Sequence, residues 1–316
     1  MRIEGIDIEA VFGCVPKRKI DNLAELTELV GSEKAAGIVK ATGFPFHRAA
    51  EQGADVFDLA LPAAMRALEG VAHEEISGII AVSFSGRDRF PALSTKLQHA
   101  LALPNSVLAY DISMACSGWV YGLFAAAQLV KISGKKVLLV DGDVQSAWTD
   151  RSNPDTLAVM GDGASATLLA PGEGSWVFSF YTDGSGADAL RCHEKISMDG
   201  FGVFRFVAGP VRKFIESFVQ STGLFEGMSP WFAPHQANMY MVRQLADALG
   251  LKDRLVGSGD KYANTGSSSA ALSMADGIPV KQGCRDPLLI AGFGAGLSAG
   301  AAATSVGEYR KGVVEI

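Results

Sequence analysis

Apolar and polar residues follow a repeating order along this chain, in which short apolar runs alternate with longer amphipathic segments. Apolar runs of roughly four to eight residues are typical of buried strands, whereas apolar positions about three or four apart are typical of helices. The strands predicted in this way are 3–12, 79–84, 106–110, 135–142, 161–169, 176–181, 231–234 and 287–291. The predicted helices are 22–30, 53–68, 94–101, 119–130, 211–222, 239–249 and 268–278. Repeated β–α units with apolar strands predict an α/β fold whose sheet is covered by helices on both faces.

Glycine and polar residues become frequent at 171–174, and the β–α alternation then starts again. We therefore expect an internal duplication, with one half in residues 1–172 and a second, similar half in residues 173–316. The final segment, 308–316, is expected to form a short exposed tail.

The composition is typical of a globular protein with a large core, since 48% of the 316 residues are hydrophobic and 20% are charged. The formal net charge of −6 argues against nucleic acid or an anionic membrane as a partner, because both attract basic surfaces. The long apolar stretch at 287–303 is interrupted by glycines and is not expected to span a membrane. Residues 1–5 do not resemble a signal peptide, so we expect a cytoplasmic protein.

Four cysteines are spread along the chain without a C-x-x-C spacing, at Cys14, Cys116, Cys192 and Cys284. This spacing predicts reduced thiols and neither disulfides nor a zinc site. The glycine-rich run at 292–300 is not followed by Lys-Ser or Lys-Thr, which excludes a phosphate-binding P-loop. We expect no metal and no cofactor.

Cys116 lies where the strand predicted at 106–110 is followed by the apolar helix predicted at 119–130. Free N–H groups at a helix start favour a thiolate, which lowers the pKa of a cysteine from about 8.5 towards neutrality. The neighbours Ala115 and Ser117 are small and leave room for a substrate carbonyl. The alternative is an inert core thiol, because a free cysteine is often buried as a small hydrophobe.

Two polar motifs in the second half offer hydrogen-bond donors. His235 lies in a Pro-His-Gln-Ala-Asn run between a predicted strand and a predicted helix, and Asn264 precedes the helix at 268–278. Imidazoles and amides both donate to a developing oxyanion, and a histidine also supports a nucleophilic cysteine. Taken singly, the histidine has a plainer interpretation as a cap or core residue, and the asparagine as part of an ordinary turn.

Taken together, these motifs resemble one family, the β-ketoacyl-acyl-carrier-protein synthases III of the thiolase superfamily. The matching segments occur in the family's order, at Cys116, 161–164, 234–238, 264–267 and the glycine-rich run around Phe293. The resemblance implies a thiolase fold, in which two similar halves form a five-layered αβαβα sandwich, and it implies a homodimer. It also implies a catalytic triad of Cys116, His235 and Asn264.

The resemblance further implies a condensing enzyme that works in two stages. Cys116 takes an acyl group from a thioester of an acyl carrier protein or coenzyme A, and a malonyl-type thioester then loses carbon dioxide. His235 and Asn264 donate hydrogen bonds to the enolate oxygen, while backbone N–H groups at Cys116 and near Ala295, beside Gly294, form a second oxyanion hole. Two alternatives stay open: an acyltransferase of secondary metabolism that makes C–O or C–N bonds, and a subunit that shapes the pocket of a hetero-oligomeric ketosynthase.

Several family positions are changed in this chain. Where the family carries a tryptophan and an arginine that hold the coenzyme A adenine, this sequence has Gly37 and Ala41, which predicts weak binding of free coenzyme A. The family's carrier-docking arginine falls on Tyr240, and Arg243 one turn later is the candidate for that role. Phe90 matches an aromatic that the family inserts across the dimer into the partner's pocket, and the alternative is a core phenylalanine under its own loop.

Overall fold

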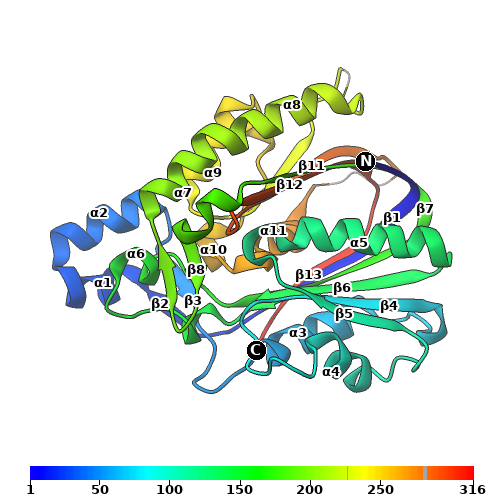
Figure 1. Ribbon diagram of the computed structural model, residues 1–316, viewed down its shortest axis with the longest axis horizontal. Helices are drawn as coiled ribbons and strands as arrows, with labels where there is room; N and C mark the ends of the chain where they lie inside the picture. The colour runs from blue at the N-terminus through cyan, green and yellow to red at the C-terminus, as the bar shows by residue number, and fades with distance from the viewer. Residues whose placement is uncertain (226, 280–282) are drawn as a thin grey trace.

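Five layers of alternating helices and strands make up the molecule (Figure 1). The structure is a computed structural model that describes residues 1–225, 227–279 and 283–316. One outer layer contains α8 (Arg212–Thr222) and α9 (Met239–Ala248), and the other contains α3 (Val56–Ala67) and α4 (Leu93–Ala100). Two layers of strands lie between them, separated by α5 (Gly118–Ser133) and α11 (Ser269–Gly277). The predicted α/β fold with five layers is confirmed.

The two layers of strands are joined because one long strand, β7 (Gly163–Thr182), belongs to both. The order across the layers is β10 (Trp231–Pro234), β11 (Asp286–Gly294), β12 (Ser298–Val306), β7, β6 (Lys136–Asp143), β4 (Ile76–Val82) and β5 (Leu108–Ile112). The strand β1 (Arg2–Val15) pairs with β7 and with β13 (Arg310–Glu315). Among the described residues, two antiparallel pairs of short strands are separate from this sheet. One is β2 (Lys19–Asp21) with β3 (Phe46–Arg48), and the other is the hairpin of β8 (Leu190–Cys192) and β9 (Ile196–Met198).

The continuity of β7 shows that the predicted break between two strands at 171–174 is wrong. The strand continues because β1 runs antiparallel beside it on both sides of this run, with Ile6 opposite Pro171 and Glu4 opposite Ser175. The middle of the run is exposed, which explains its polar composition. The predicted boundary between the two halves therefore lies inside a continuous strand, and that division of the chain stays a prediction.

The C-terminal segment is a strand, so the prediction of an exposed tail at 308–316 is wrong. β13 runs parallel to β1, with Ala10 opposite Arg310 and Val15 opposite Glu315. The buried Arg48 donates to the Glu315 carboxylate at 2.6 Å, which connects this end of the chain to β3. The sequence of this segment is typical of a tail because its strand exposes the charged residues Lys311 and Glu315.

The helix α5 forms the centre of the core. Its residues Trp119, Val120 and Leu123 are buried between the two layers of strands, and it ends at Gly134 in the left-handed conformation typical of a helix C-terminus. Among the described residues, 115–133 is the one helical segment long and apolar enough to cross a membrane by length and composition. In this structure it is the core helix, and it places the end of β5 next to its own first turn.

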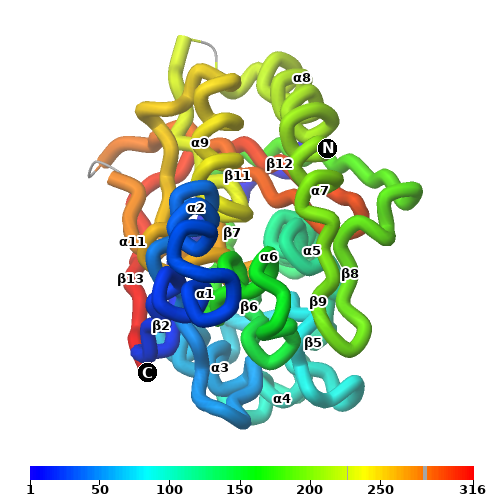
Figure 2. Tube along the Cα trace, turned by 90° about the vertical axis from the view of Figure 1, so that its left-hand side faces the viewer, coloured from blue at the N-terminus to red at the C-terminus, as the bar shows by residue number. Residues whose placement is uncertain are grey.

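Several short elements gather on one face of the molecule, which Figure 2 shows from the front. They are α1 (Asn22–Val30), α2 (Ser32–Thr42), α6 (Pro154–Leu157), α7 (Gly200–Phe206) and the β8–β9 hairpin. The predicted helix at 211–222 extends further back than expected, because α7 continues through a π-helical turn at 207–211 into α8. These elements enclose the region in which the two strand layers end.

Candidate active site

Cys116 lies in a tight turn between β5 and α5, as the sequence predicts. The turn is a single 3₁₀ turn, Ala115–Ser117, that leads directly into the helix at Gly118. Ala115 has a positive φ of 44°, a conformation that costs an alanine of the order of 1–3 kcal/mol and that is often found at functional sites. A Cβ at Gly118 would lie 2.4 Å from the Val82 side chain, so this glycine lets the turn approach β4.

Two backbone N–H groups and one glycine surround the Cys116 sulfur. The N–H groups of Cys116 itself and of Ala295 hydrogen-bond to the thiol and favour its ionised form. A Cβ at Gly294 would lie 2.8 Å from the Cys116 Cβ and 3.2 Å from its Sγ, and the φ of Gly294 is 155°. The end of β11 can therefore approach the sulfur because residue 294 has no side chain.

The resting state of Cys116 is a thiol, so the prediction of a pKa lowered by the helix start is wrong. Although the residue borders a cavity, its sulfur lies deep, and burial raises the pKa of the thiol to about 12. The negative charge of Asp143 acts in the same direction, and the two N–H groups act against it. Desolvation outweighs the field of the helix, because the charged form loses its water in this position.

His235 follows the last residue of β10 and is held by the second half of the chain. Its N–H donates to the Ala291 carbonyl on β11 at 2.7 Å. The ring Nδ1 lies 2.7 Å from the hydroxyl of Ser269, which also accepts from the Gln236 N–H at 3.0 Å. Since Nδ1 is engaged, Nε2 is the ring nitrogen left for a substrate. Burial lowers the pKa of His235 to about 4, with a small opposing effect of a hydrogen bond with the Gly266 backbone, so the ring is neutral at pH 7.

Asn264 follows Ala263, another alanine with positive φ (61°), and its backbone is held on both sides. Its N–H donates to the Val159 carbonyl at 3.1 Å, and its carbonyl accepts from the Gly161 N–H at 2.9 Å. Its side-chain Oδ1 accepts from the Gly266 N–H at 2.9 Å. Because Oδ1 is engaged in this way, the Nδ2 group is the donor that remains for the cavity.

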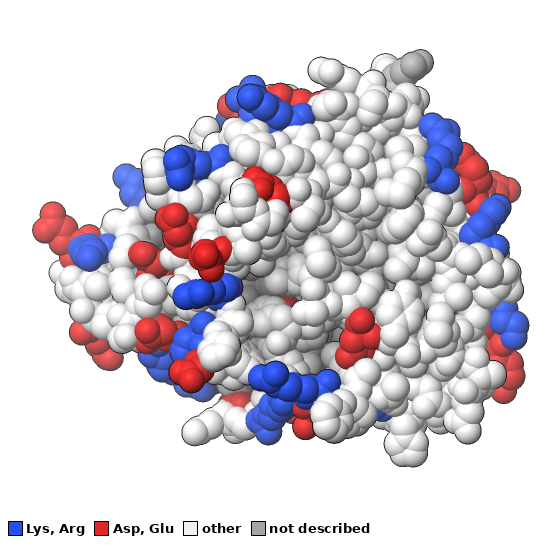
Figure 3. Space-filling view, viewed as in Figure 1, with Lys and Arg blue, Asp and Glu red and all other residues white. Residues whose placement is uncertain are grey.

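One cavity of about 590 Å³ brings the predicted residues together. Cys116, His235, Asn264, Gly294 and Ala295 all line it, although they come from four separate regions of the sequence. Apolar side chains form most of the remaining wall: Phe84, Met114, Trp148, Val159, Met160, Leu190, Ile196, Met198, Val203, Val207, Met241 and Phe293. Figure 3 shows a hollow on the face of the molecule with charged residues at its rim.

Two predicted site residues lie outside this cavity. Phe90 is 86% exposed, so the interpretation as a core phenylalanine under its own loop is wrong. Arg243 lies on the exposed side of α9, next to Tyr240 on the same helix. Both residues therefore stay candidates for contacts with another protein chain.

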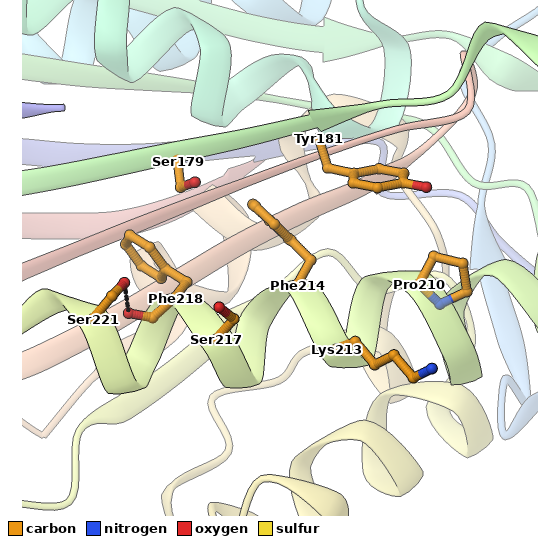
Figure 4. Close-up of a pocket in the computed structure, with 8 residues that line it drawn as sticks. All are labelled: Ser179, Tyr181, Pro210, Lys213, Phe214, Ser217, Phe218 and Ser221. Atoms are coloured by element: carbon orange, nitrogen blue, oxygen red, sulfur yellow. Dashed lines mark hydrogen bonds between the residues drawn. The ribbon is translucent and has the colours of Figure 1, made fainter.

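A second hollow of about 470 Å³ lies between α8 and the end of β7, as Figure 4 shows. Ser179 and Tyr181 project from β7 towards Phe214 and Phe218 on α8, and Lys213 points to the outside. None of the described residues that line this hollow is a histidine, cysteine, aspartate or glutamate. It holds no histidine or carboxylate to activate its serines and none of the predicted catalytic residues.

Sequence reasoning missed three buried polar residues around this site. Ser269 orients His235, while Asp143 and Gln145, at and after the end of β6, contact the loop that carries Asn264. The signal for Asp143 was present, because a carboxylate at the end of an otherwise apolar strand is costly unless it is hydrogen-bonded. The contacts themselves join residues more than a hundred positions apart and have no sequence signature.

Comparison with known proteins identifies the family of the chain. The family model for 3-oxoacyl-[acyl-carrier-protein] synthase III matches residues 110–186, and the model for the C-terminal part of that enzyme matches residues 222–306. The beta-ketoacyl-[acyl-carrier-protein] synthase III of Oceanobacillus iheyensis is 33% identical over 279 residues, which are 84% of this chain and 88% of the relative. That of Geobacillus kaustophilus is 31% identical over 312 residues, which are 96% of this chain and 100% of the relative.

Solved structures agree with the fold as well. A 3-oxoacyl-(acyl-carrier protein) synthase from Burkholderia xenovorans LB400 superimposes with a TM-score of 0.94 at 28% identity, covering 100% of this chain and 98% of the other. The priming β-ketosynthase of the R1128 polyketide pathway gives a TM-score of 0.87 at 28% identity and covers 97% of each chain. The fold and the site thus define a thiolase-like condensing enzyme. The chain belongs to the β-ketoacyl-[acyl-carrier-protein] synthase III family, whose members transfer acyl groups and condense them with malonyl thioesters.

Proposed function

We propose that this chain is a ketosynthase III that loads an acyl group onto Cys116 and condenses it with a malonyl-type thioester. The observation that carries the proposal is the meeting of Cys116, His235 and Asn264 in one largely apolar cavity. An apolar wall suits an acyl chain, and three polar groups at its end suit the chemistry of a thioester.

The first stage is transfer of the acyl group to the sulfur. Because burial keeps Cys116 protonated, its proton has to leave as the sulfur attacks the thioester carbonyl. The neutral His235 ring accepts that proton through Nε2. The N–H groups of Cys116 and Ala295 stabilise the tetrahedral oxyanion, and the original thiol departs after the His235 proton returns to it.

The second stage forms the new carbon–carbon bond. The malonyl carboxylate leaves as carbon dioxide, and its bonding electrons form an enolate on the remaining thioester. Between the stages the His235 ring changes tautomer by proton exchange with solvent, so that Nε2 carries the hydrogen and Nδ1 accepts from the Ser269 hydroxyl. Asn264 Nδ2 and His235 Nε2 then donate to the enolate oxygen, and the enolate carbon attacks the acyl carbonyl. The Cys116 thiolate is expelled and takes up a proton from solvent, which restores the resting thiol.

We propose that a carrier protein delivers the acyl group in preference to free coenzyme A. Gly37 and Ala41 lie on the exposed side of α2, where neither offers a ring or a charge to an adenine nucleotide. Arg151, the nearby candidate for a nucleotide phosphate, is paired with Glu25. On α9, the exposed Arg243 and Tyr240 suit contact with an acidic carrier.

We also propose a homodimer that works in the cytoplasm. Phe90 projects from its loop into solvent, and β5 is the outermost strand of its layer, with Leu108 51% exposed. An exposed apolar edge strand is a ready site for pairing with another chain. The four cysteines are unpaired, which agrees with a reducing compartment.

Intact-protein mass spectrometry tests the loading stage. After incubation with a panel of acyl thioesters, wild type and Cys14→Ala, Cys192→Ala and Cys284→Ala should each gain one acyl mass. Cys116→Ala should gain none. An acyl adduct that persists in Cys116→Ala would remove the basis of the proposal.

A further inference from the structure

Asp143 is a buried carboxylate that takes no part in the reaction proposed above but contacts segments on both sides of it. It is the last residue of β6 and is fully buried. One oxygen, Oδ1, accepts from the Ser83 hydroxyl and from the Phe84 N–H, both at 3.0 Å. The other, Oδ2, accepts from the Ser267 hydroxyl at 3.1 Å and from its N–H at 3.4 Å.

These contacts connect the carboxylate to Asn264. The Gly266 N–H donates to Asn264 Oδ1 at 2.9 Å, so residues 264–267 form one short hydrogen-bonded turn. A Cβ at Gly266 would lie 2.5 Å from Asp143 Oδ2, and Gly266 has a positive φ of 65°. Because Gly266 has no side chain, the Asp143 carboxylate can lie in contact with the turn that orients the Asn264 amide.

Gln145 provides a second contact with the same loop. Its Nε2 donates to the Asn264 carbonyl at 2.6 Å and to the Gly161 carbonyl at 2.8 Å. The side chain is buried and borders the cavity. Since both partners are carbonyl oxygens, the amide cannot be reversed without placing its oxygen against two others.

We propose that Asp143 is a positioning residue, which with Gln145 holds the Asn264 amide in place to receive the enolate oxygen. The inference rests on the proposed function, because a position matters only if Asn264 donates during decarboxylation. Positioning groups act without touching the substrate, and a displacement of about 1 Å can cost on the order of 100-fold in rate.

The charge of Asp143 adds a second effect that a purely structural residue would not have. Titratable groups that face it are Asp141 on β6, Cys116 on the catalytic turn and Cys192 on β8. The negative charge raises the pKa of the Cys116 thiol and thus opposes thiolate formation. Burial raises the pKa of Asp143 to about 6, so its carboxylate is charged at neutral pH and above. Removing the charge should favour acylation in that range and at the same time misplace Asn264.

Asp143→Asn removes the charge and keeps the shape, but its NH2 group must face either the Ser267 N–H or the Phe84 N–H, so one of the two backbone contacts is lost. Relative to wild type, decarboxylation of a malonyl thioester should fall roughly 10- to 100-fold in kcat with little change in KM. The pH profile of Cys116 acylation should shift down by about one unit. Gln145→Leu should lose decarboxylation in the same way but leave the acylation profile in place, since it changes no charge.

Asp141→Asn is the matched control. Asp141 is also a fully buried carboxyl on β6, but its partner is Ser165 and it has no hydrogen bond with the 264–267 turn. This variant should decarboxylate at nearly the wild-type rate, and thermal unfolding of both variants shows whether a loss of activity follows from a loss of stability. If Asp143→Asn does not fold, Gln145→Leu alone carries the test of positioning.

The possible results distinguish this inference from the proposed function. If wild type releases no carbon dioxide from any malonyl thioester, the proposed function fails. If wild type condenses normally, and both Asp143→Asn and Gln145→Leu do so at its rate, only the positioning inference is overturned. Equal losses in Asp143→Asn and Asp141→Asn would also overturn it, because they would indicate a general effect of replacing a buried carboxyl group on β6.

Discussion

The residues at the cavity differ in what they can do with a proton, and substitutions should therefore separate the stages of the reaction. Asn264 has no proton to exchange near neutral pH, so its contribution is electrostatic. Asn264→Ala should keep self-acylation of Cys116 but lose decarboxylation by roughly 100- to 1000-fold, the typical effect of one oxyanion donor. Mass spectrometry measures the first stage and carbon dioxide release measures the second. Normal turnover by Asn264→Ala would leave the acyltransferase as the better explanation.

His235 serves both stages, so its loss should be broader. His235→Ala should slow acylation because no neutral base remains beside the buried thiol, and it should abolish decarboxylation because one enolate donor is gone. Pre-steady-state loading of an acyl thioester, followed by carbon dioxide release, measures both in one preparation. Acylation at the wild-type rate would show that the thiol loses its proton by another route.

The burial of two neutral histidines should make the free energy of unfolding depend on pH. The folded-state pKa values of His235 and His47 are each about 4, below the ordinary value of 6.5, chiefly because both rings are buried. As the pH falls, the unfolded chain therefore binds a proton at each histidine before the folded chain does. Each histidine thus lowers the free energy of unfolding as the pH falls from 6.5 to 4 and has no such effect above pH 6.5.

Denaturant unfolding at pH 7 and at pH 5 measures this cost. Relative to His235→Gln, wild type should lose up to about 1.4 kcal/mol of unfolding free energy per pH unit across that window. His47→Gln should show the same difference in stability while keeping activity, since His47 does not line the cavity. A difference that stays constant with pH would contradict the neutral, buried state.

At the scale of single elements, α2 carries the two positions at which the family resemblance places the adenine contacts. Gly37 and Ala41 are one turn apart on its exposed side, so the helix offers no stacking surface and no charge there. Free coenzyme A should bind weakly to wild type. The double variant Gly37→Trp, Ala41→Arg should bind it roughly tenfold more tightly, because one aromatic contact is worth about 0.5–1.5 kcal/mol beyond its area.

Calorimetry with coenzyme A and with phosphopantetheine makes this comparison. Ala36→Trp is the matched control, because it adds the same ring to α2 but faces away from residues 37 and 41. Tight, adenine-dependent binding to wild type would show that another part of the surface holds the nucleotide, and a carrier protein would then not be the preferred donor.

At the scale of the whole molecule, the open edge at β5 predicts association of two chains. Sedimentation at micromolar concentration should give a dimer. Leu108→Lys should shift it towards monomer, because a charge would replace an apolar side chain at the pairing edge. Met228→Lys, at a residue 53% exposed and remote from β5 in the sequence, serves as the control and should remain dimeric. A wild-type monomer would rule out a pocket shared through Phe90.

Much of this protein was decided by the local order of its residues. The helix at Asn22–Val30 and the strand at Trp231–Pro234 have the predicted bounds, because capping and apolar runs act over a few neighbouring positions. The meeting of Cys116 with His235 and Asn264 was predictable as well, but only through the family resemblance. Nothing in the local pattern says that these residues approach one another.

Tertiary structure alone decided the rest, since the physical causes join distant segments. β7 continues through a polar run because β1 pairs with it on both sides, and β13 is a strand because β1 offers it an edge. The thiol of Cys116 is protonated because burial outweighs the helix field, and the depth of a sulfur cannot be read from its neighbours in sequence. For the same reason the contacts of Asp143 with Ser267 became visible only when the fold brought the end of β6 against the turn that carries Asn264.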